Sequence, residues 1–235
     1  MRRIIAATLG VSLAMCLGVQ PAQATPVIEF AEDGGAFTQV ATSFCGTGCQ
    51  MFVGAFGDFS INVTTGLNSG TPDIPNLDLN SLNVSSNSSG VQHTLHIRMS
   101  EVGFTLTPFQ GIMSVGGTSS QGGPFSFSAY ADQSNTAFGI ATPLGSSLTF
   151  PGIPVFGGLT AFNVSLGTPY SLTLAADLTT ATNGRMQVSF DQQLQTVPEG
   201  GTLLLLGMGL AGIGFWRYRT DASIWIRGSA QDGVI

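Results

Sequence analysis

The chain has 235 residues, of which only 9% are charged, and all seven of its basic residues are Arg. Thirteen carboxylates bring the formal net charge to −6 at pH 7, which argues against nucleic-acid binding, because phosphate backbones are bound by clusters of basic side chains. A hydrophobic content of 43% can build a folded core, which argues against a disordered chain.

The first 24 residues have the three parts of a secretory signal peptide. Arg2-Arg3 forms a positively charged start, and Ile4–Val19 is an apolar core. Ala22 and Ala24 supply the small side chains of an A-x-A cleavage site, so we expect signal peptidase to cut before Thr25.

Two other interpretations of this N-terminal segment are weaker. A retained membrane anchor fits poorly, because the apolar core is short for a span of about 20 residues and is followed by a good cleavage site. Leu13–Cys16 is similar to a lipobox, but Met15 is bulky where a small residue is expected. A lipoprotein therefore remains a minor alternative.

Residues 25–196 are expected to form one extracellular domain. This segment has two Arg against ten carboxylates, a formal charge of −8, and its size suits a single domain with a real core. An acidic surface without Lys suits a protein that stays soluble outside the cell.

Short runs of alternating apolar and polar residues, separated by Gly, Pro, Asn and Ser, predict an all-β fold for this domain. We expect strands at Phe59–Thr64, Leu77–Val84, Val91–Met99, Val102–Thr107, Phe125–Ala131, Leu159–Leu166, Tyr170–Ala176 and Met186–Phe190. Val91–Met99 and Val102–Thr107 are expected to pair as a hairpin, and Pro151–Gly158 is expected to be a loop. Eight or more strands over this length suit a two-sheet antiparallel sandwich, jelly-roll-like in type.

Cys45 and Cys49 are the two cysteines that remain after signal cleavage. In an oxidising compartment, two nearby thiols most simply form a disulfide, and the Gly residues between them allow the tight bend. A redox role is the alternative, but no helical pattern follows that would lower a thiol pKa.

The sequence offers few candidates for catalysis or metal binding. His93 and His96 are the only histidines, and on a strand they point to opposite faces, so a two-His zinc site is not expected. The chain lacks the Gly-x-Ser-x-Gly and His-Glu-x-x-His motifs. Asp58, Asp73 and Asp78 do not match a calcium-binding loop and are expected at the solvated surface. We therefore expect no enzymatic activity, no catalytic residue, no metal site and no cofactor.

A polar turn, an apolar segment and a basic end follow the domain at residues 197–219. Gly201–Trp216 would be about 24 Å long as a helix, a marginal single transmembrane span. Arg217 and Arg219 would act as stop-transfer charges that stay in the cytoplasm. A buried core helix is the alternative, but the frequent Gly residues make this a poor soluble helix.

This segment resembles the PEP-CTERM sorting signal of exopolysaccharide-producing Gram-negative bacteria. Val197, Pro198 and Glu199 match the start of the signal, and Gly200 stands where a second Pro is usual. The resemblance implies recognition by an exosortase, a membrane cysteine protease that cleaves near the Pro-Glu motif and releases or transfers the protein. Thr220–Ile235 extends beyond the pattern as an atypical tail.

Together, these features predict an exported protein that is anchored transiently in the inner membrane and then sorted to the outer surface or the extracellular matrix. Its expected partners are signal peptidase and an exosortase-like protease. A structural or adhesive role in the envelope or biofilm is the leading hypothesis. A carbohydrate-binding module for exopolysaccharide is the alternative, and a secreted hydrolase has no motif in its favour.

Overall fold

The computed structural model describes residues 25–46, 49–65, 73–86, 90–152, 154–197, 208 and 210–211. The predicted signal peptide with Ala22 and Ala24, the motif residues Pro198–Gly200, Arg217 and Arg219, and the tail lie outside these residues. The chain divides into two units, Met1–Thr196 and Val197–Ile235. Among the described residues, no helix has the length and apolar character that a membrane span requires.

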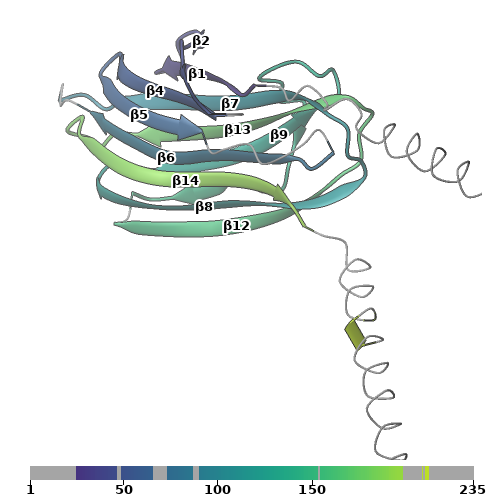
Figure 1. The fold of residues 1–235 in the computed structure, drawn as a ribbon. Coiled ribbons are helices and arrows are strands. Elements are labelled where there is room, and N and C mark those ends of the chain that lie inside the picture. Colours follow the sequence, from purple (N-terminus) through teal and green to yellow (C-terminus); the bar gives the residue numbers. More distant parts are fainter. Residues whose placement is uncertain are drawn as a thin grey trace, which may run out of the picture. The chain divides into compact units, whose positions relative to one another are not determined.

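The described part of the first unit consists of two antiparallel sheets that pack face to face (Figure 1). Sheet A has the strand order β10-β9-β13-β7-β1-β2, and β11 also pairs with β9. Its strands are β1 (Val27–Glu32), β2 (Thr38–Gln39), β7 (Thr94–Phe104), β9 (Phe125–Asp132), β10 (Thr142–Pro143), β11 (Leu148–Phe150) and β13 (Tyr170–Thr179).

Sheet B has the strand order β12-β8-β14-β6-β5-β4-β3. Its strands are β3 (Ser43–Gly46), β4 (Cys49–Phe56), β5 (Phe59–Thr65), β6 (Asn76–Ser86), β8 (Phe109–Gln121), β12 (Val155–Val164) and β14 (Met186–Thr196). From β6 to β9, and again from β12 to β14, consecutive strands alternate between the two sheets. Each of these connections therefore crosses from one layer to the other.

The core lies between the sheets and is rich in Phe. Phe127 of sheet A and Phe190 of sheet B meet edge to face, with ring centroids 4.9 Å apart. Phe127 also packs on Phe156 of sheet B at 5.8 Å. All three side chains are at most 4% exposed, so these rings connect the two layers. Pairs of this geometry contribute about 0.5–1.5 kcal/mol beyond their burial.

The expected all-β, two-sheet antiparallel sandwich is confirmed, and several predicted strands lie inside observed ones. Phe125–Ala131 falls within β9, and Met186–Phe190 begins β14. In both, apolar side chains alternate with polar ones, and the apolar set faces the core.

The predicted hairpin of Val91–Met99 with Val102–Thr107 is wrong. β7 runs without a break from Thr94 to Phe104 and pairs with β1 on one side and β13 on the other. The polar run at Ser100-Glu101, which resembled a turn, is buried in the sheet. Ser100 Oγ donates a hydrogen bond to the Leu172 carbonyl at 2.9 Å, so its polar group is satisfied inside the sheet.

The expected loop at Pro151–Gly158 is only half correct, because β12 already begins at Val155. Its partner β8 was not predicted, since its many Gly and Ser residues resemble a turn. Gly117 of β8 shows why Gly is required within a strand here. A Cβ at this position would lie 2.5 Å from Cζ of Phe156, so Gly lets the ring of Phe156 pack against the backbone.

Candidate functional site

The outer face of sheet B carries a hollow of about 410 Å³. It is built by four neighbouring strands, because alternation sends their apolar side chains into the core and their polar ones outward. The hollow is lined mainly by small, uncharged polar side chains: Ser60, Asn62, Asn83, Val84, Ser85, Thr118, Ser120, Gln187, Val188 and Ser189.

Strand register arranges these side chains in rows that cross the sheet. Asn62 of β5 is opposite Asn83 of β6, which is opposite Ser189 of β14, which is opposite Thr118 of β8. Neighbouring strands lie about 4.8 Å apart, so the row offers amide and hydroxyl groups at that spacing. We call this set (Asn62, Asn83, Ser189 and Thr118) the polar row.

A second hollow of about 360 Å³ lies on the same face of β6, β8 and β14. Asp78, Gln193 and Ser114 form a cross-strand set within it. Burial and the nearby Asp191 carboxylate both raise the pKa of Asp78. Asp191 Oδ1 accepts a hydrogen bond from the Ser81 backbone N–H at 2.5 Å. This end of the face is therefore rich in acceptors, whereas the polar row supplies both donors and acceptors.

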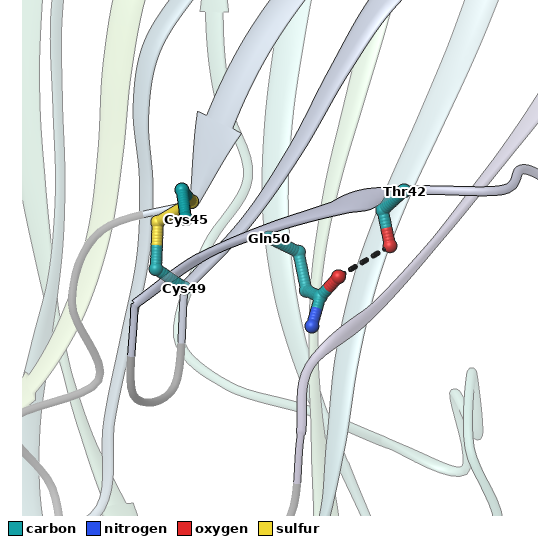
Figure 2. Close-up of a disulfide and its surroundings, with 4 residues drawn as sticks. All are labelled: Thr42, Cys45, Cys49 and Gln50. Atoms are coloured by element: carbon teal, nitrogen blue, oxygen red, sulfur yellow. Dashed lines mark hydrogen bonds between the residues drawn. A yellow bond between two sulfur atoms is a disulfide. The ribbon is translucent and has the colours of Figure 1, made fainter.

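The predicted disulfide between Cys45 and Cys49 is confirmed, and it closes the β3–β4 hairpin (Figure 2). The two Cα atoms are 5.2 Å apart. Next to this hairpin, Thr42, which directly precedes β3, donates a hydrogen bond from Oγ1 to Oε1 of Gln50 on β4 at 2.5 Å. The bridge stabilises the edge of sheet B, and it lines neither of the two hollows.

The two histidines have separate partners. His93 precedes β7, and its Nδ1 lies 2.6 Å from Asp33 Oδ2 while its Nε2 lies 3.2 Å from Asp58 Oδ2. The hydrogen bond to Asp33 is the main cause that raises the pKa of His93. His96 lies on β7 and its Nδ1 is 2.6 Å from Asp177 Oδ1.

Sequence spacing missed the cluster around His93. Glu32, Asp33 and His93 offer one ligand-type atom each within 4.8 Å of one another, although about sixty residues separate His93 from the two carboxylates. Pairing of β1 with β7 brings them together. The side chain of Asp58, which was expected at the solvated surface, is 45% exposed, and its Oδ2 lies 3.2 Å from His93 Nε2.

The family model of the PEP-CTERM protein-sorting motif matches residues 196–219. No curated relative matches the chain. Among solved structures, the chain is similar to the CBM22-1 xylan-binding domain of Paenibacillus barcinonensis Xyn10C, with 10% identity, 65% of this chain and 87% of that chain covered, and a TM-score of 0.33. It is also similar to TmCBM61, solved in complex with β-1,4-galactotriose, with 8% identity, coverage of 61% and 92%, and a TM-score of 0.35.

These structural likenesses are too distant to assign a ligand. The sorting motif is different, because it matches the segment where the Val-Pro-Glu start, the apolar run and the Arg pair occur in order. The chain is therefore a protein with a PEP-CTERM sorting motif at residues 196–219.

Proposed function

We propose that this exported, exosortase-processed protein binds an extended polysaccharide on the outer face of sheet B, and so has a structural or adhesive role at the cell surface or in the extracellular matrix. The observation that supports this most directly is the polar row with its continuation toward Asp78. The two hollows lie on the same strands, so together they form a hydrogen-bonding surface along the sheet.

The chemistry of this surface favours a polyol over other partners. Hydroxyl and amide side chains donate and accept hydrogen bonds, as sugar hydroxyls do. The lining includes few apolar side chains, whereas the core of a protein–protein interface is apolar and aromatic. The acidic balance of residues 25–196 disfavours a polyanion.

The remaining expectations fit this proposal. Signal peptidase would remove residues 1–24, and residues 201–216 would anchor the chain transiently in the inner membrane, with Arg217 and Arg219 on the cytoplasmic side. The disulfide suits an oxidising compartment. We propose no enzymatic activity and no cofactor. The alternation of strands between the sheets supports a jelly-roll type of sandwich.

Binding of the purified mature protein to the exopolysaccharide of its host tests the proposal. Asn62→Ala combined with Ser189→Ala should weaken binding about thirtyfold, because each removes a hydrogen-bonding group worth about 1 kcal/mol. Asn163→Ala is the matched control, since Asn163 is exposed on β12 of the same sheet but lines neither hollow. Absence of binding, or equal binding by the double variant, would contradict the proposal.

Mass spectrometry of the mature chain in its host tests processing separately. We expect an N-terminus at Thr25 and a new C-terminus near Pro198-Glu199. A chain that still ends at Ile235 would contradict exosortase processing, while leaving the binding proposal to its own test.

A further inference from the structure

Sheet A also carries a hollow on its outer face, a cleft of about 330 Å³. Its floor is formed by His96 and Arg98 of β7 and by Asp177 of β13. Phe37, from the connection between β1 and β2, lines it together with Tyr130 of β9. The cleft is thus bordered by a loop and by strand side chains, unlike the open face of sheet B.

The charged groups of this cleft are already paired within the protein. His96 Nδ1 lies 2.6 Å from Asp177 Oδ1, and Arg98 Nη1 donates to Glu29 Oε1 at 3.4 Å. The guanidinium carbon of Arg98 also lies 3.9 Å from the centre of the Phe37 ring. An anionic ligand would have to compete with Glu29 for Arg98, so the floor does not favour ionic recognition.

Polar atoms remain available beside these pairs. The observed pair uses His96 Nδ1 and Asp177 Oδ1, so among the described residues His96 Nε2, Asp177 Oδ2 and the Tyr130 hydroxyl make no hydrogen bond. The ring nitrogens of His96 donate or accept according to the tautomer. The cleft therefore offers an imidazole nitrogen, a carboxylate acceptor and a hydroxyl that can both donate and accept.

Apolar surface lies next to these polar atoms. Ile140, from the β9–β10 connection, is 48% exposed and lines the cleft with the rings of Phe37 and Tyr130. A pocket with apolar walls and a few convergent polar groups is the usual form of a small-molecule site. A sugar matches both parts, because its hydroxyl groups suit the acceptors and its C–H faces suit aromatic and aliphatic side chains.

We propose that this cleft is a second glycan site, which binds a single neutral sugar unit at the end or branch of a polysaccharide. The choice of a matrix polysaccharide as the source rests on the proposed function, but the site is separate from it, since the two surfaces belong to different sheets. The cleft of about 330 Å³ suits a short unit, whereas the two hollows on the outer face of sheet B suit an extended chain.

Calorimetric titration of the mature protein with short oligosaccharides tests this proposal. The probes are the neutral trisaccharides cellotriose, xylotriose and galactotriose, with trigalacturonate as the anionic comparison. At least one neutral trisaccharide should bind more tightly than trigalacturonate. Asp177→Asn should weaken that binding about tenfold, because it removes a charged acceptor, and Tyr130→Phe should weaken it about threefold.

Asn163→Ala is the matched control, since Asn163 is exposed on β12 and lines none of the three hollows, and this variant should bind the trisaccharide as the unchanged protein does. Thermal melting should show that all variants remain folded. The proposal is overturned if no neutral trisaccharide binds, if trigalacturonate binds best, or if neither Asp177→Asn nor Tyr130→Phe changes the affinity. If the double variant of Asn62 and Ser189 loses trisaccharide binding while Asp177→Asn and Tyr130→Phe both keep it, the sugar binds on sheet B, which overturns the cleft and supports the proposed function.

Discussion

The outer faces of the two sheets arise from the same strand pattern but differ in what lies over them. On sheet B, the outward residues Ser60, Asn62 and Ser85 are exposed. On sheet A, the outward residues Ser171 and Thr173 are fully buried. Loops cover part of sheet A, so one face becomes a cleft and the other stays open.

Polar side chains under the loops of sheet A need hydrogen-bond partners within the protein, whereas those exposed on sheet B do not. Ser171 Oγ donates to the Thr136 carbonyl of a covering loop at 2.7 Å, and Thr173 Oγ1 donates to Ser100 Oγ at 3.0 Å. Buried polar groups need such partners, because an unpaired one costs about 1–3 kcal/mol. On sheet B, solvent can satisfy the same residue types, which leaves them available to a ligand.

Phe190→Ala should destabilise both sheets and thereby abolish the difference between their outer faces, because this ring connects the two layers through Phe127. We expect a loss of about 3–5 kcal/mol in the free energy of unfolding and a weakening of both surfaces together. Urea denaturation measures the loss. Leu159→Ala, at a side chain that is 67% exposed on β12, should change stability by less than about 0.5 kcal/mol. A similar effect of both variants would argue against the inter-sheet contact.

Replacing Cys45 and Cys49 together by Ser should affect sheet B more than sheet A. The bridge closes a short loop with a sequence separation of four, so loop entropy predicts a loss of about 2 kcal/mol in stability. Thermal melting with and without a reductant measures it. The reductant should lower the melting temperature of the unchanged protein but not that of the double variant. Loss of trisaccharide binding in the folded variant would contradict the separation of the two faces.

Arg98→Met should damage the sheet A cleft while leaving the polar row intact. Burial raises the pKa of Glu29, and Arg98 opposes that rise. Without Arg98 the pKa of Glu29 should rise further, so the variant should lose about 1 kcal/mol of stability at pH 7 and less at pH 4, where the carboxyl is protonated. Urea denaturation at both pH values measures this. Arg185→Met, at an exposed Arg, is the control, and an equal loss at both pH values would contradict the role of Glu29.

The smallest expected effect concerns the β1–β2 connection, which begins at Asp33 and borders the sheet A cleft. The pKa of His93 is raised above its usual 6.5, mainly by its hydrogen bond to Asp33. The stability that the protonated ring contributes is complete below about pH 6.5 and is lost as the pH rises through the folded-state value. The melting temperature should therefore fall as the pH rises above about 6.5, and His93→Gln should remove that fall.

At low pH, the carboxylates next to the His93 ring become protonated, which limits the stability that the protonated ring contributes. Partial burial disfavours the charged form of Asp33, but hydrogen bonds from the Thr94 N–H and from His93 outweigh it and lower the pKa of Asp33. Its contribution is present above the unfolded value and is lost as the pH falls. His96→Gln is the control, because it leaves the contacts of His93 with Asp33, Asp58 and Glu32 in place. Identical pH profiles for the unchanged protein and His93→Gln would contradict this assignment.

The sequence predicted the sandwich wherever side chains alternate cleanly. Phe125–Ala131 is such a case, because each apolar residue faces the core. The strand prediction failed where polar or small residues lie in the middle of a strand. Ser100 is satisfied by a carbonyl from another strand, and Gly117 makes room for a ring from β12. Neither partner can be recognised from the local sequence.

The candidate sites were less predictable than the fold. Asn62 and Ser189 join one surface only because β5, β6 and β14 are neighbours in a fixed register. Arg98 meets Phe37 across a loop whose path the alternation of residues does not encode. By contrast, the disulfide was predictable, since four residues of chain already bring its two thiols close together.

The position of β14 has a mechanical consequence. This strand lies in the middle of sheet B, between β6 and β8, and ends at Thr196, where the sorting motif starts. A pull at this point that acts along the strand would load the hydrogen-bond ladders on both sides of β14 in shear. Many hydrogen bonds would then share the force, rather than opening one after another. We expect a domain tethered through this end to withstand drag without unfolding from its attachment point.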